Sequence, residues 1–163
     1  SYEARSSIQA FNIIVKEFKS KGNLKIKDLK ITYFEVDHKP VKDAFGFNFL
    51  NKNKKLTISG DTRPCENIMK YGQKADVLLH EVFIDGELKK TNKMRSKKTL
   101  HNVRSYHTPS TLLGKIAKLT NCKKLVLTHL VPTKFNENKL KKTIRNDFGK
   151  DPIIGQDLLK IKI

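Results

Sequence analysis

The sequence has few cysteines, no long apolar run and a shortage of acidic side chains. Cys65 and Cys122 are its only cysteines, so they build no disulfide framework, and their spacing is not that of zinc ligands. No apolar run approaches the roughly 18–20 residues that span a bilayer, and no secretory signal is visible. We therefore expect a cytoplasmic protein without a membrane partner. Because the chain begins at Ser1, we also expect residues upstream to have been removed.

The shortage of acidic groups leaves a large positive charge. Lysine and arginine number 34 against 16 acidic residues, which gives a formal net charge of +18. Such a field attracts nucleic acid or another anionic partner. Surface lysines in a lysine-rich proteome would produce the same charge without any binding function, so both interpretations stay open.

The pattern of apolar residues predicts an α/β protein, with residues 1–163 forming a single domain or part of one. Asn136 is expected to cap a helix with an apolar stripe at Leu140, Ile144 and Phe148. The other expected helices cover residues 3–20, 64–71 and 110–119. The expected strands cover residues 24–36 in two pieces, 45–49, 56–58, 75–79, 125–127, 153–154 and 158–163. Residues 85–106 are rich in lysine and arginine without apolar periodicity. This predicts a basic loop that lies over the residues on either side of it, Glu81 and His107.

Ionisable residues follow several of these apolar stretches. Asp61 comes after a short strand and a glycine, His80 and Glu81 follow the apolar run 75–79, and His129 follows 125–127. His107 comes just before a helix. Because the ends of neighbouring strands in an α/β sheet meet at one edge, these side chains are expected to converge there.

Each of these residues also has a simpler interpretation. Asp61 could cap the helix that follows it, as Thr108 could cap the next helix. A lone histidine such as His129 is often a hydrogen-bonded core residue. His38 and His101 are interpreted as surface groups or, at most, groups at the edge of a substrate site. The order of the motifs, rather than any single one, favours a shared site.

In that order the motifs resemble the C-terminal half of a metallo-β-lactamase-fold hydrolase. The nearest branch contains tRNase Z and the arylsulfatase-like metallo-hydrolases. The segments that carry the resemblance are Ser59-Gly60-Asp61-Thr62-Arg63-Pro64-Cys65, Val77-Leu78-Leu79-His80-Glu81, His107-Thr108-Pro109-Ser110, Leu125-Val126-Leu127-Thr128-His129-Leu130-Val131-Pro132 and Ile153-Ile154-Gly155-Gln156-Asp157-Leu158-Leu159.

The resemblance implies an αββα sandwich with two zinc ions at one edge. It assigns Asp61 to the carboxylate that bridges the metals and His129 to a terminal metal ligand. It assigns Glu81 and His107 to a pair that helps to protonate the leaving group. His80 and Thr62 receive supporting roles only, and a homodimer is compatible with the family.

One large difference separates the chain from that family. Members carry a His-x-His-x-Asp-His cluster that supplies most metal ligands, and no His-x-His pair occurs in this sequence. The chain alone is therefore expected to bind zinc weakly or not at all and to be inactive. It is interpreted as a fragment, a segment separated from its partner segment, or a degenerate relative.

These observations lead to three functional hypotheses. In the complete protein, a metal-bound hydroxide would hydrolyse a phospho- or sulfo-ester of an anionic small molecule. The first alternative is a tRNase Z-like endoribonuclease that acts on RNA. The second is a non-catalytic basic module that binds nucleic acid, which would explain the charge and the missing ligand cluster together.

Overall fold

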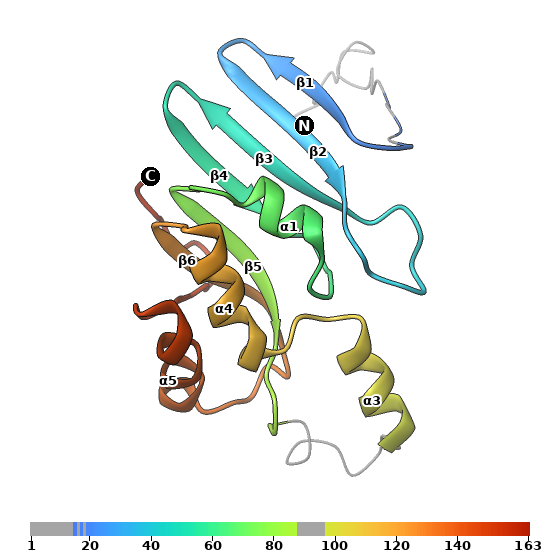
Figure 1. Ribbon diagram of the computed structural model, residues 1–163, viewed down its shortest axis with the longest axis vertical. Coiled ribbons are helices and arrows are strands. Elements are labelled where there is room, and N and C mark those ends of the chain that lie inside the picture. Colours follow the sequence, from blue (N-terminus) through green and yellow to red (C-terminus); the bar gives the residue numbers. More distant parts are fainter. Residues whose placement is uncertain (1–14, 16, 18, 88–96) are drawn as a thin grey trace, which may run out of the picture.

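The computed structural model describes residues 15, 17, 19–87 and 97–163. They form a seven-stranded mixed sheet whose strand order, β1 to β7, follows the sequence (Figure 1). Most of the helix expected over residues 3–20 lies outside the described residues. No described helix has the length and apolar character needed to cross a bilayer.

The first four strands are antiparallel and form a meander. They are β1 (Gly22–Ile26), β2 (Leu29–Glu35), β3 (Phe45–Asn51) and β4 (Lys54–Ile58). Both tight hairpins have two-residue turns, and the first turn residue, Lys27 or Lys52, has a positive φ of 53°. That backbone twist matches the twist of the flanking strands. The expected division of residues 24–36 into two strands is confirmed.

The second part of the sheet is parallel and alternates with helices. Strands β5 (Val77–Phe83), β6 (Lys124–Val131) and β7 (Ile153–Ile154) follow β4 in that order, and each pairs in parallel with its neighbour. The connecting helices are α1 (Glu66–Tyr71), α3 (Lys97–Ser105), α4 (Ser110–Thr120) and α5 (Glu137–Phe148). Asn136 caps α5 as expected, because its side chain accepts a hydrogen bond from the Lys139 amide.

Helices α1, α4 and α5 cover one face of the sheet, and the main core lies between them and the strands (Figure 1). Leu78 and Leu125 from the sheet share this core with Leu113 of α4 and Ile144 of α5, all of them at most 1% exposed. One sheet with one helical layer is half of an αββα sandwich. The expected α/β class is confirmed.

Several predictions about elements were wrong, among them the end of β6, which continues past Leu127 through Val131. Strand β5 does not end at Leu79 but continues through Phe83, and residues 158–163 form no strand. Residues 85–106 are not a loop throughout, because helix α3 occupies residues 97–105. Residues 88–96 of that basic segment lie outside the described part of the chain.

Candidate active site at the strand ends

The structure brings four of the predicted site residues together at one end of the parallel strands. Asp61 follows β4, Glu81 lies in β5, His129 lies in β6 and His107 precedes α4. The expectation that polar residues come after the strands was only partly correct, because Glu81 and His129 lie inside them. The strands continue because distant segments satisfy their polar groups; Ser59 Oγ, for example, accepts the Glu81 amide N–H at 3.1 Å.

Glu81 is the most buried acidic group of the site, with a side chain only 1% exposed. Its Oε2 lies 3.1 Å from Nδ1 of His107, and its Oε1 accepts the backbone N–H of Thr108 at 2.6 Å. A buried carboxylate requires such donors. A carboxylate oxygen accepts at His107 Nδ1, so the proton of a neutral His107 resides on Nδ1 and Nε2 carries none.

Asp61 and His129 form the more exposed part of the site. Asp61 Oδ2 lies 3.4 Å from His129 Nε2, and their side chains are 42% and 49% exposed. Glu81 is paired with Thr128, and Val82 is paired with Leu130, so His129 is the extra residue of a β-bulge. The bulge gives His129 a φ of 42°. This bulge directs its side chain to the rim beside Asp61.

The interpretation of Asp61 as a helix cap is not supported. Helix α1 begins at Glu66, with Cys65 at its N-cap position. Within the described residues, the Asp61 carboxylate accepts no helix N–H. The preceding Gly60 has a φ of 62° and packs against the backbone of Phe45, where a side chain would collide. That turn brings Asp61 out of the strand and toward β6.

Thr62 and Thr108 connect the loops around the site. The hydroxyl of Thr108 donates to the Thr62 carbonyl at 2.7 Å. The expected capping role of Thr108 is wrong, since Pro109 occupies the N-cap position of α4. Asp85 takes over part of that role, because its Oδ2 accepts from the amide and the hydroxyl of Thr111.

His80 lies apart from the other site residues. It is fully buried, and its Nδ1 donates to the Glu81 carbonyl oxygen at 2.7 Å. Neighbouring side chains of a strand point to opposite faces, so His80 and Glu81 diverge. Burial lowers the pKa of His80 below its ordinary value, and Nε2 has no hydrogen-bond partner among the described residues. His80 is therefore a neutral core residue.

His38, interpreted from the sequence as a surface group or at most a group at the edge of a substrate site, lies beside His107, and Tyr106 was not predicted as a member of the site. His38 Nδ1 donates to the Tyr106 carbonyl oxygen at 2.9 Å, and its ring centroid lies 5.1 Å from that of His107. The His107 ring in turn lies 5.4 Å from His129. Three imidazoles therefore form a row along the rim. No local pattern in the sequence indicates this, since His38 belongs to the connection between β2 and β3.

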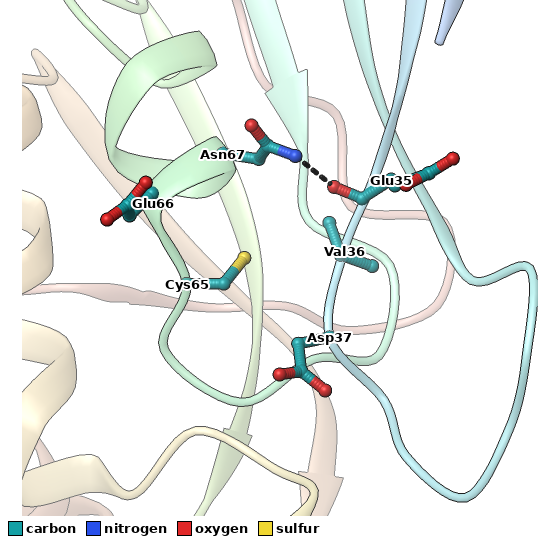
Figure 2. A pocket seen from close by; sticks show the side chains of 6 residues that line it. All are labelled: Glu35, Val36, Asp37, Cys65, Glu66 and Asn67. Carbon is teal, nitrogen blue, oxygen red and sulfur yellow. Dashed lines mark hydrogen bonds between the residues drawn. The ribbon is translucent and has the colours of Figure 1, made fainter. Parts of the chain in front are cut away.

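A pocket of about 320 Å³ lies next to this connection, lined by residues from the end of β2 and the start of α1 (Figure 2). Asn67 closes one side by donating to the Glu35 carbonyl oxygen at 2.8 Å. Burial raises the pKa of Asp37, but hydrogen bonds from Arg63 and from the Lys39 backbone outweigh it, so the pKa lies below its ordinary value. These contacts fix the chain on both sides of the pocket.

The donors at the rim fit zinc only in part. A carboxylate oxygen and an imidazole nitrogen, from Asp61 and His129, are ligand types that zinc accepts. A catalytic zinc site ordinarily has three protein ligands for each ion. The described residues contain no group of three His, Cys, Asp or Glu side chains that could hold a metal. These residues alone therefore do not complete a zinc site.

No protein-family model matches the chain. Ribonuclease Z of Bacillus licheniformis is 35% identical over 99 residues, which are 58% of this chain and 29% of the relative. Ribonuclease Z of Mycobacterium tuberculosis strain H37Rv is 25% identical over 130 residues, which are 78% of this chain and 46% of the relative. The metallo-β-lactamase fold protein YhfI from Bacillus subtilis superposes with a TM-score of 0.66 at 21% identity, covering 85% of this chain and 52% of YhfI.

The chain therefore has the metallo-β-lactamase fold. Its relatives in sequence are ribonucleases Z, so the predicted resemblance is confirmed. The chain spans 29% and 46% of the lengths of these two relatives, which agrees with the expectation of a partial fold.

Proposed function

We propose that this chain carries part of the active site of a metal-dependent RNA phosphodiesterase of the ribonuclease Z kind. The observation that carries the proposal is the pairing of Asp61 with His129 and of Glu81 with His107 along one rim. The two pairs are adjacent, since the rings of His107 and His129 are 5.4 Å apart. The pair for metal ligation and the pair for proton transfer would then act on the same substrate molecule.

In this proposal the two pairs have different tasks. Asp61 and His129 would hold zinc together with donors from outside this chain. Bound zinc would supply a water of lowered pKa and neutralise charge on the substrate. Glu81 would keep the proton of His107 on Nδ1 in the neutral ring. A protonated His107 would donate from Nε2 to the leaving oxygen, a contribution of about 10²–10⁴-fold.

An RNA substrate is favoured over a small sulfate or phosphate ester. The relatives reported above are ribonucleases, and the formal charge of +18 suits a polyanion. RNA held through phosphate contacts would be released steeply as salt rises. A small ester with a single anionic group would show a much weaker salt dependence.

A fusion protein tests the proposal. The part of Bacillus licheniformis ribonuclease Z that precedes its matched stretch would be joined to this chain, and zinc content and precursor-tRNA cleavage would be measured. Asp61→Ala and His129→Ala should lower both. His107→Ala should retain zinc and lose about 10²–10⁴-fold in cleavage rate. Asp28→Ala, at an exposed position in the β1–β2 turn, is the matched control.

Two outcomes would refute the proposal. Unchanged zinc content and cleavage in Asp61→Ala would remove Asp61 from the metal site. A fusion without zinc that binds RNA in a salt-sensitive manner would support the non-catalytic basic module instead.

A further inference from the structure

His38 reaches the site from a part of the chain distant in sequence. Its Nδ1 donates to the Tyr106 carbonyl oxygen at 2.9 Å, immediately before His107. Its ring also lies edge-on to the Tyr106 ring, with centroids 5.2 Å apart and an interplanar angle of 88°. The His107 ring is 5.1 Å away. One side chain thus contacts both the backbone and the ring of the segment that carries the proposed proton donor.

We propose that His38 is a positioning residue for His107. It holds the Tyr106 carbonyl in place and packs against the His107 ring, so that Nδ1 stays on Glu81 and Nε2 faces the reacting group. The inference rests on the proposed function for the role of His107 as proton donor. Its structural content, the orientation of one imidazole by another, can be measured without any hydrolysis.

The chain segment before His38 is itself fixed by hydrogen bonds. Arg63 Nε donates to Asp37 Oδ2 at 2.8 Å, and the Arg63 amide donates to the Asp37 carbonyl at 2.9 Å. The Asp37 amide also donates to Thr62 Oγ1 at 3.2 Å. These three hydrogen bonds join Asp37 to the loop after Asp61. They fix the backbone from which the His38 side chain extends. A rigidly held group loses little entropy when it orients another.

Glu81 does not bond to the Tyr106–His107 peptide, whereas His38 does. The carboxylate contacts one edge of His107 at Nδ1 and also the Thr108 amide. Neither of these hydrogen bonds reaches the peptide before His107, whose carbonyl belongs to Tyr106. The hydrogen bond at the Tyr106 carbonyl fixes it. The segment around His107 is therefore bonded on one side to β5, through Glu81, and on the other to the β2–β3 connection, through His38.

Histidine NMR tests the inference on the ¹⁵N-labelled 163-residue chain. Two-bond ¹H–¹⁵N spectra report which ring nitrogen of His107 carries the proton, and amide exchange at Thr108 reports its bond to Glu81. In His38→Ala, we expect His107 to lose its fixed Nδ1–H form. We also expect Thr108 exchange to become about tenfold faster, which corresponds to the loss of roughly one hydrogen bond.

Two further variants separate positioning from general structure. His38→Asn retains an N–H donor for the Tyr106 carbonyl and should restore most of the His107 signature. His101→Ala removes an exposed histidine of α3 and should leave that signature unchanged. If His38→Ala unfolds the chain, His38→Asn carries the test.

The inference is overturned if His38→Ala leaves the protonated nitrogen of His107 and the Thr108 exchange unchanged. It is also overturned if a folded His38→Asn shows no recovery relative to a folded His38→Ala, or loses the signature itself. Neither result bears on cleavage by the fusion protein. Conversely, a fusion without activity leaves the NMR result intact, so the two proposals can fail separately.

Discussion

Glu81 and His107 meet inside the protein, with Oε2 and Nδ1 3.1 Å apart and side chains that are 1% and 6% exposed. The same carboxylate accepts the Thr108 amide N–H. The contact therefore fastens the segment before α4 to the centre of strand β5. A pair proposed for proton transfer is at the same time a structural connection.

Removal of this connection should destabilise the fold. Glu81→Ala removes two hydrogen bonds to a buried charged group and leaves the Thr108 amide without its acceptor. We expect the free energy of unfolding to fall by about 3 kcal/mol, since hydrogen bonds to charged groups contribute about 1.5–3 kcal/mol each. Urea unfolding followed by circular dichroism measures the change. Glu35→Ala, with an exposed side chain at the end of β2, should change it by less than about 0.5 kcal/mol. Equal effects of the two substitutions would contradict the structural role of Glu81.

Asp76 should make stability depend on pH in the acid range. Its Oδ1 accepts from Lys123 Nζ and its Oδ2 from the Lys55 amide, both at 2.8 Å. These hydrogen bonds, that of Lys123 first, lower the pKa of Asp76 below 3.8. The stabilisation is therefore complete above that value and is lost as the pH falls through the lower pKa of the folded state.

The substitution Asp76→Asn tests this dependence. At pH 7 we expect the free energy of unfolding to fall by about 1–2 kcal/mol, most of it from the Lys55 amide, because Lys123 is largely exposed. The difference between the variant and the parent chain should narrow below pH 3.8. Urea unfolding at several pH values checks it, and a difference that stays constant down to the lowest pH would show that the charge of Asp76 is not involved.

Some features of the site could be predicted from the sequence because they depend on local chemistry. Asn136 caps α5 through the residue three positions later, and Gly60 permits the turn that leads to Asp61. The alternation of helices and strands also depends on short-range patterns. With parallel strands, it brings Asp61 and His129 to the same edge. Each of these steps needs only neighbouring residues and a general rule of topology.

Other features depend on partners from distant parts of the chain. Strand β5 was expected to end at Leu79, where the apolar run stops, but it continues because Ser59 and Thr108 supply hydrogen bonds to Glu81. The contact of His38 with Tyr106 joins two loops whose proximity only the complete fold determines. Such pairings leave no periodic pattern in a single sequence.

His80 should give the chain a second pH dependence, nearer to neutrality. Burial lowers its pKa below 6.5, so the folded state remains neutral at a pH where the unfolded chain takes up a proton. Stability is therefore complete above the unfolded pKa and decreases as the pH falls below it, by up to about 1.4 kcal/mol per pH unit. His80→Asn should remove this slope between pH 6.5 and the onset of the Asp76 effect. His101→Ala, at an exposed position, should retain it, and a slope unchanged in His80→Asn would mean that another group titrates.

The packing of α4 against the sheet gives the most direct test of the core. Leu113 is fully buried in the cluster between helices and sheet, whereas Leu119 of the same helix is 62% exposed. Leu113→Ala should lower the free energy of unfolding by about 2–5 kcal/mol, because it removes buried methyl groups and leaves a cavity. Leu119→Ala changes the same side chain in the same helix and should cost less than about 1 kcal/mol. Thermal or urea unfolding of both variants measures the difference. Since α4 begins next to the His107–Glu81 pair, a folded Leu113→Ala should also show faster amide exchange at Thr108. Similar costs for the two variants would mean that α4 does not bury its Leu113 face against the sheet.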